Sequence, residues 1–126
     1  MKLTPTDDKL EQEGAWVDYY DYQLQIARYD VEKHQKLFQQ LTRPHRKQIE
    51  NDTISDELVA DITVTIMVRQ LLLNWSDNVP MEYNEENAKK LLLMDRDCRD
   101  FVNKTAKDIN NYMLPKEEEI ELISEK

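Results

Sequence analysis

Apolar residues alternate with polar ones near the start of the chain and recur at helical spacing along the rest of it. Within residues 15–29, Tyr22, Leu24 and Ile26 alternate with glutamine and alanine, which is the period of a β-strand. The aromatic and β-branched residues of this stretch favour a pleated surface, and residues 18–21 suit a turn. The pattern predicts a small amino-terminal β-hairpin that packs on helices or pairs with another copy, because an isolated hairpin is only marginally stable.

Helical spacing begins near residue 30 and predicts a helix over residues 30–42. Its apolar face consists of Val31, His34, Phe38 and Leu41. Pro44 disfavours helical backbone at Arg43, so the helix should break there, and Pro44 can begin a short second helix that carries Ile49. Thr53 or Ser55 can cap the helix that follows, because their hydroxyl groups accept hydrogen bonds from free N–H groups.

The next predicted helix, over residues 56–74, is apolar on nearly every side. Its apolar residues are Leu58, Val59, Ile62, Val64, Ile66, Met67, Val68, Leu71, Leu72 and Leu73. Such a helix is expected at the centre of the core, or with a second face buried in an oligomer. Thr63, Thr65, Arg69 and Gln70 interrupt the run, which indicates a buried helix rather than a membrane span.

Two further helices follow, which completes a mainly α-helical pattern. Asn84 caps a helix that turns Leu91 and Leu92 inward, and the pattern breaks or bends near Asp95. A second apolar stripe then runs through Cys98, Phe101, Val102, Thr105, Ala106, Ile109, Tyr112 and Met113, and Pro115 ends it. We therefore expect a mainly α fold, a bundle of four to five helices around the central apolar helix, with the small β-hairpin at its amino-terminal side.

The composition fits a single domain. The chain has 126 residues, of which 40% are hydrophobic and 34% are charged, which is enough to build its own core. We expect a flexible amino terminus over residues 1–13, one helical domain over residues 14–114, and an acidic mobile tail over residues 115–126. The single cysteine, Cys98, fits a reducing cytoplasm, and the first residues lack the apolar stretch of a signal peptide.

The net charge of −9 is unevenly distributed: residues 1–50 carry −1 and residues 51–126 carry −8. An acidic surface repels phosphate groups, so nucleic acid is not an expected partner. The acidic part can attract a basic protein partner, or it can simply keep the protein soluble. We favour the interpretation that the acidic residues simply keep the protein soluble.

No group of residues points to catalysis, a cofactor or a metal ion. Gly14 is the only glycine, so a phosphate-binding glycine-rich loop is missing. The two histidines, His34 and His45, lie in no known motif, and with one cysteine their spacing matches no zinc site. His34, on an apolar helix face, is expected to be a packed histidine. We therefore expect a protein that is not an enzyme.

Candidate partner-binding residues fall in two places. Arg43, His45, Arg46 and Lys47 form the one local basic cluster. This cluster can bind acidic segments of a partner, including the acidic tail of a neighbouring copy, or it can be an ordinary solvated helix start. Positive charge is unfavourable at a helix start, which keeps the first interpretation open although the second is favoured.

The other candidates are aromatic, Trp75 and Tyr83. Trp75 can anchor a partner, since tryptophan is enriched in binding hot spots. It can also close the core beneath the polar crossing that follows it, and this second interpretation is favoured.

Residues 71–94 resemble the second half of phage tail assembly chaperones made by siphovirus-like, lambda-like phages and prophages. That family reads as a leucine-rich helix, Trp, a polar turn, Pro, an aromatic residue, and then Asn or Ser with Glu opening another leucine-rich helix. The matching residues are Leu72, Trp75, Pro80, Tyr83, Asn84, Glu86, Asn87, Leu91 and Leu92. Residues 14–17, 26–28 and 41–57 are similar to earlier parts of the family, so the likeness spans roughly residues 12–113. The turn after Trp75 lacks the glycine expected there, which leaves its shape open.

The resemblance implies a chaperone of the phage tail tape measure protein that acts in the cytoplasm of the bacterial host. Such chaperones coat this long helical protein in many copies, help to recruit tail tube protein, and are absent from the finished virion. In some members a ribosomal frameshift adds a second domain, and this chain would then be the unextended form. Coating in many copies implies possible homo-oligomers, and the acidic charge and the interrupted apolar run leave neither nucleic acid nor a membrane as an expected partner.

Two other interpretations from different classes stay open. The protein can be a minor structural tail or head–tail component retained in the virion. It can also be an acidic inhibitor that mimics DNA, although interleaved Lys and Arg residues argue against this.

Overall fold

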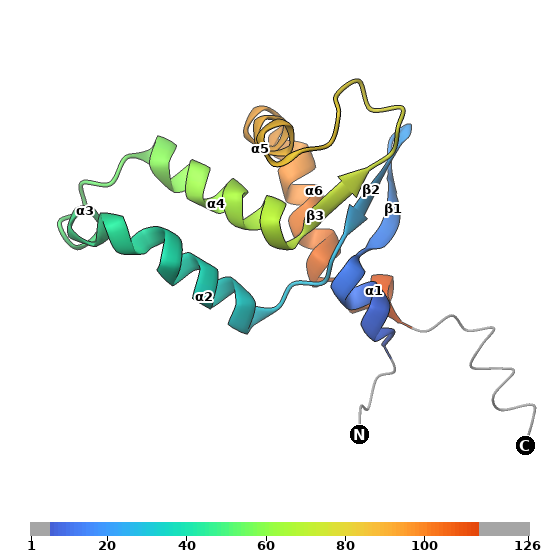
Figure 1. Cartoon of the computed structure of the whole chain (residues 1–126), viewed down its shortest axis with the longest axis horizontal. Coiled ribbons are helices and arrows are strands. Elements are labelled where there is room, and N and C mark those ends of the chain that lie inside the picture. Colours follow the sequence, from blue (N-terminus) through green and yellow to red (C-terminus); the bar gives the residue numbers. More distant parts are fainter. Residues whose placement is uncertain (1–5, 114–126) are drawn as a thin grey trace, which may run out of the picture.

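The computed structural model describes residues 6–113, and the acidic tail expected over residues 115–126 lies outside them. Six α-helices lie in this part of the chain: α1 (Asp8–Glu13), α2 (Val31–Thr42), α3 (Arg46–Glu50), α4 (Asp56–Gln70), α5 (Glu85–Met94) and α6 (Arg96–Lys107). Two 3₁₀ turns, η1 (Arg43–His45) and η2 (Ile109–Tyr112), and three strands, β1 (Ala15–Tyr19), β2 (Tyr22–Ile26) and β3 (Leu72–Trp75), complete it (Figure 1). The mainly helical class is therefore confirmed.

The three strands form one antiparallel sheet in the order β1-β2-β3. β1 and β2 make the hairpin that the alternating pattern predicts, with Tyr19 opposite Tyr22 and the turn at Tyr20 and Asp21. Tyr20 has a φ of 55°, so the turn places a non-glycine residue in the left-handed region. The hairpin is not isolated, because β3 pairs along the other edge of β2.

The prediction that the central helix runs to residue 74 is wrong. Helix α4 ends at Gln70, and Leu72–Trp75 form β3. The amide of Ala27 donates to the carbonyl of Leu71 at 2.8 Å, and the amide of Ser76 donates to the carbonyl of Gln23 at 2.9 Å. A short run of leucines fits a helix or a buried strand equally well, and the free edge of β2 decides between them here.

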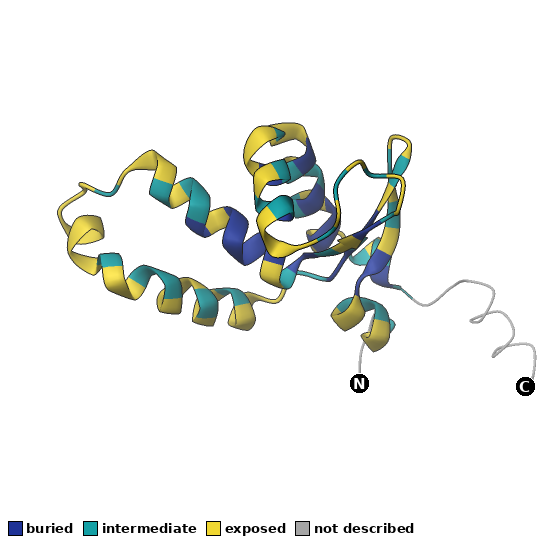
Figure 2. Ribbon diagram, turned by 45° about the horizontal axis from the view of Figure 1, so that its top comes forward, coloured by how far each residue is buried: buried dark blue, intermediate teal, exposed yellow. Residues whose placement is uncertain are grey.

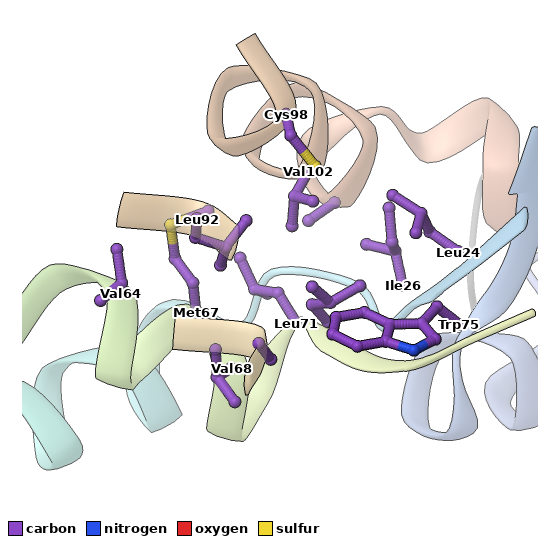
Figure 3. Close-up of a cluster of buried hydrophobic side chains, with 13 residues drawn as sticks. Leu24, Ile26, Val64, Met67, Val68, Leu71, Trp75, Leu92, Cys98 and Val102 are labelled. Carbon is purple, nitrogen blue, oxygen red and sulfur yellow. The ribbon is translucent and has the colours of Figure 1, made fainter. Parts of the chain in front are cut away.

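The hydrophobic core lies between the sheet and helices α4, α5 and α6 (Figure 3). Its buried residues are Leu24, Ile26, Val64, Met67, Val68, Leu71, Leu72, Trp75, Ala88, Leu92, Cys98, Val102 and Ala106. The apolar stripe predicted for the last helix supplies the α6 members of this cluster. A helix bundle around α4 is not confirmed: α5 packs on α4 and α6 on α5, but the core that they enclose is shared with the sheet.

Polar side chains set the helix boundaries. Ser55 and Asn84 cap α4 and α5 as predicted. The amide of Leu58 donates to the Ser55 hydroxyl at 3.1 Å, and the amide of Asn87 donates to the side-chain oxygen of Asn84 at 2.7 Å. Asp95 ends α5 and accepts from the amide of Cys98 at 3.0 Å, so it also begins α6. The predicted break near residue 95 is therefore confirmed, and one aspartate supplies it.

The start of the described chain packs against its end. Helix α1 lies within residues 1–13, which were expected to be flexible, and Asp7 caps it. The amide of Asp7 donates to the carbonyl of Tyr112 at 2.7 Å, and Thr6 forms a β-bridge with Met113. Glu11 and Arg28 form an ion pair at 2.6 Å, which attaches α1 to the segment after β2.

Candidate partner-binding surface

A helical arm extends from the body of the protein. It consists of α2, η1, α3 and the first turns of α4 up to Asp61, and α3 lies at its far end (Figure 1). α2 packs along α4, and at the base of the arm the side-chain amide of Gln70 donates to the carbonyl of Lys33 at 3.0 Å. Neither α2 nor α3 contains a buried residue, so the arm contributes little to the core.

Local chemistry explains how the chain turns at the tip of the arm. Pro44 has no N–H to continue α2, and the chain passes through the 3₁₀ turn η1 into α3. After α3, Asp52 has a φ of 55°, and the amide of Thr53 donates a hydrogen bond to the carbonyl of Gln48 at 2.8 Å. Such a left-handed residue is a common helix end, and it turns the chain back toward α4. The interruption predicted at residues 43–44 is confirmed.

Most of the arm is exposed or only partly buried (Figure 2), and large apolar residues are among its exposed positions. The exposed fractions are 46% for Phe38, 43% for Ile49 and 45% for Val59, and Val31 is more exposed still. The buried residues of α4 begin only at Ile62. A helix that is apolar on nearly every side is thus half buried in the core, and its first turns leave apolar surface available for a partner.

The basic cluster predicted as a partner site lies at the tip of the arm. Arg43, Arg46 and Lys47 are exposed and His45 is partly buried. Within residues 6–113, none of the four forms an ion pair. The start of α3 has no side-chain cap, so the basic side chains do not stabilise the helix that begins there. A set of cations without local partners is free to meet acidic groups of another chain.

A surface groove, which we call the tip groove, lies between α2 and α3. Its lining residues are Phe38, Gln39, Thr42, Arg43, Arg46, Ile49 and Glu50. The groove combines exposed apolar side chains with two guanidinium groups and a single carboxylate. This combination suits a peptide that carries both apolar and acidic residues.

The aromatic candidates lie in the body, away from the arm. Trp75 is only 4% exposed, and its indole N–H donates to the carbonyl of Met81 at 2.8 Å. The Tyr83 hydroxyl donates to the carbonyl of Leu72 at 2.5 Å, and its ring meets the Trp75 ring edge-on with centroids 5.0 Å apart. Burial, and then the carboxylate of Glu85, raise the pKa of Tyr83. Trp75 therefore closes the core beneath the crossing, as the favoured interpretation has it, and is not an exposed anchor.

The crossing between β3 and α5 needs no glycine. The amide of Gln23 donates to the Ser76 hydroxyl at 3.0 Å, and the side chain of Asn78 donates to the carbonyl of Asp21 at 2.8 Å. Among the described residues only Gly14, Tyr20 and Asp52 have positive φ, so the turn after Trp75 uses ordinary backbone geometry. The turn therefore keeps its shape without the glycine that the resemblance would place there.

The described residues show how the other chemically reactive side chains are used. Cys98 is buried, and burial, followed by the charge of Asp95, raises its pKa to about 11, which disfavours a reactive thiolate. His34 packs between Tyr29 and Phe38, with ring centroids 5.3 and 6.2 Å away. Across residues 6–113 there is no cluster of three or more His, Cys, Asp or Glu residues able to hold a metal ion.

None of the helices in the described part of the chain has the length and apolar character needed to cross a membrane. The structure thus brings Arg43, His45, Arg46 and Lys47 together at the tip of the arm, and it pairs Trp75 with Tyr83 in the body. The exposed apolar residues beside the basic cluster were not predicted from the sequence to bind a partner. The sequence pattern places Phe38 on the apolar face of its helix and Ile49 on the short helix after Pro44.

Comparison with known protein families gives one result. Residues 29–121 match the model of the family described as YdaY prophage protein, which is about three quarters of the chain. The match begins directly before α2, so it includes the helical arm, β3, α5 and α6 and leaves out α1 and the hairpin. No curated protein and no solved structure matches the chain. The chain therefore belongs to the YdaY prophage protein family and is a prophage-encoded protein.

Proposed function

We propose that this protein is a non-catalytic phage tail assembly chaperone that binds the tail tape measure protein through its helical arm. The observation that carries the proposal is the arm itself, an extended helical hairpin whose α2 and α3 bury no residue and which exposes Val31, Phe38, Ile49 and Val59. Membership of a prophage family supports the phage context. The resemblance of residues 71–94 to tail assembly chaperones supplies the specific role.

The chemistry of the arm suits a long helical partner. Apolar side chains spaced along a helix can pack against the apolar stripe of a second helix. Each such contact is weak, and many copies along one partner would add their contributions. The proposed site of action is the cytoplasm of the bacterial host, before the tail is complete, and tail tube protein is a proposed second partner.

Co-expression tests the proposal. The chain is produced together with the tape measure protein of the phage or prophage that encodes it. We expect the partner to become soluble and to co-purify with several copies of this chain. A slippery heptamer in the coding DNA near the tail codons would add support for this assignment.

A paired variant locates the binding surface. Val31→Glu with Val59→Glu places acidic residues in the first turns of α2 and α4, where the helix dipole favours them, so folding should be preserved. We expect at least a tenfold loss of co-purified partner, as removal of a buried apolar contact implies. Leu93→Glu, at an apolar site on α5 that is 44% exposed, is the matched control and should not change binding.

A different result would replace the proposal. If the partner stays insoluble with the native chain and the chain is found in purified virions, the protein is a minor structural component of the tail or head–tail joint. If Val31→Glu with Val59→Glu binds as well as the native chain, the arm is not the binding surface.

A further inference from the structure

The tip groove is lined by exposed apolar side chains together with two arginines. Phe38 and Ile49 leave nearly half of their surface open to solvent there, although both are large apolar residues. Arg43 and Arg46 line the same groove and form no ion pair with any described residue. Glu50 is the only carboxylate in the lining, so the groove favours an occupant that is acidic as well as apolar.

The chain itself contains a segment of that composition. Residues 114–126 carry five glutamates against two lysines, and Ile120, Leu122 and Ile123 lie among them. The apolar residues match Phe38 and Ile49 of the tip groove, and the glutamates match its two arginines together with Lys47. Bidentate pairing with carboxylates is the geometry in which arginine binds most selectively.

The position of the last described residue favours a groove on another copy. Met113 is held beside α1 by its bridge to Thr6, whereas α3 lies at the opposite end of the long axis of the molecule (Figure 1). Thirteen residues can span roughly 45 Å when fully extended, which is long enough to reach a neighbouring molecule. Within one molecule, the same segment would have to run along the body and the whole arm.

We propose that the acidic segment 116–126 of one copy docks in the tip groove of a second copy. The contact joins two different surfaces, so each bound copy still offers a free groove or a free acidic segment. The association therefore produces chains or closed rings, of which the smallest is a dimer whose two copies exchange their segments. This proposal does not rest on the chaperone function, because it concerns the chain alone.

Charge reversal in the full-length chain tests the pairing. The groove variant carries Arg43→Glu and Arg46→Glu, and the tail variant carries Glu117→Lys and Glu119→Lys. The matched control, Arg96→Glu with Lys104→Glu, makes the same change of charge at exposed positions of α6. Sedimentation equilibrium at about 50 mM salt measures association, and circular dichroism verifies that each variant is folded.

The expected pattern is specific. The native chain and the α6 control associate with increasing concentration, and about 500 mM salt weakens this association. The groove variant alone and the tail variant alone each associate at least tenfold more weakly, because like charges then face each other. An equimolar mixture of the two variants regains association, since every acidic segment again meets a basic groove and every basic segment meets an acidic one.

Three results would overturn the proposal. The first is a native chain that stays monomeric at all concentrations, which is also the result expected if the segment docks within its own molecule. The second is self-association of the groove variant with native affinity. The third is a mixture of the groove and tail variants that stays as weakly associated as either one alone. None of these results bears on binding of the tape measure protein, which Val31 and Val59 test separately.

Discussion

The hydroxyl of Tyr112 donates a hydrogen bond of 3.0 Å to the backbone carbonyl of Ile26, which lies 86 positions earlier in the chain. Both residues are fully buried. The bond joins η2, at the end of the described chain, to the central strand of the sheet. Through the neighbouring bond from the amide of Asp7 to the carbonyl of Tyr112, it also holds α1 in place.

Tyr112→Phe should lower the free energy of unfolding by about 1–2 kcal/mol, because the variant leaves a buried carbonyl without its donor. Urea denaturation followed by circular dichroism measures the change. Tyr20→Phe is the control, since the Tyr20 ring is almost entirely exposed and should show no comparable loss. Equal stability of Tyr112→Phe and the native chain would mean that the bond contributes nothing to folding.

Stability should fall at alkaline pH. Burial, and then the charge of Asp95, raise the pKa of the Cys98 thiol from 9.0 to about 11. The folded chain therefore holds this proton more tightly than the unfolded chain does. The resulting stabilisation is complete below pH 9 and is lost as the pH rises through about 11. Burial raises the pKa of Tyr112 in the same direction.

Urea midpoints measured between pH 8 and pH 11 report this dependence. Cys98→Ala should show a shallower decline over the same range, whatever its absolute stability, because the titrating thiol is gone. A native midpoint that does not change up to pH 11 would contradict the assigned pKa shift.

The two tryptophans should differ sharply in solvent access. Trp75 is buried and bonded to Met81, whereas Trp16 on β1 is 49% exposed. In Trp16→Phe, the remaining emission should be blue-shifted and weakly quenched by acrylamide, because Trp75 is shielded. In Trp75→Phe, the remaining Trp16 should be readily quenched. Similar quenching in the two variants would place Trp75 on the surface and return it to the set of partner anchors.

Gly14→Ala should be destabilising even though residue 14 ends a short helix. Gly14 has a φ of +97°, and an added Cβ would lie 2.9 Å from the Gln25 side chain and 3.1 Å from the backbone of Ile26. Backbone strain of this kind costs about 1–3 kcal/mol. Urea denaturation measures the loss, and Gln12→Ala, at an exposed position of the same helix, serves as the control. A Gly14→Ala chain as stable as the control would show that β2 can move aside.

Hydrogen exchange should divide the protein into a protected body and a less protected arm. Amides of α2 and α3 should exchange much faster than those of α6, because no residue of α2 or α3 is buried, whereas α6 buries Cys98, Val102, Thr105 and Ala106. Exchange followed by mass spectrometry measures the difference. Equal protection of α2 and α6 in a monomeric sample would contradict the description of the arm as a weakly packed extension.

Several elements could be predicted from the sequence because local chemistry determines them. The caps at Ser55 and Asn84, the break at Asp95 and the interruption at Pro44 depend on a few neighbouring atoms. The hairpin of β1 and β2 follows from a period of two residues. The basic cluster could be named in advance because its members lie within residues 43–47.

The remaining features depend on contacts between distant segments. Whether Leu72–Trp75 are helix or strand is decided by the edge of β2, about fifty positions earlier, and no local pattern encodes that edge. The groove beside the basic cluster exists because α3 folds back against α2, which leaves Phe38 and Ile49 exposed on the same side. By itself the sequence determined the helices, their ends and the hairpin, since these arise from spacing and hydrogen bonding over a few residues. Only the tertiary structure decided that the helices cover a three-stranded sheet and that α2 and α3 project from it, because burial is a property of surfaces that meet from far apart in the chain.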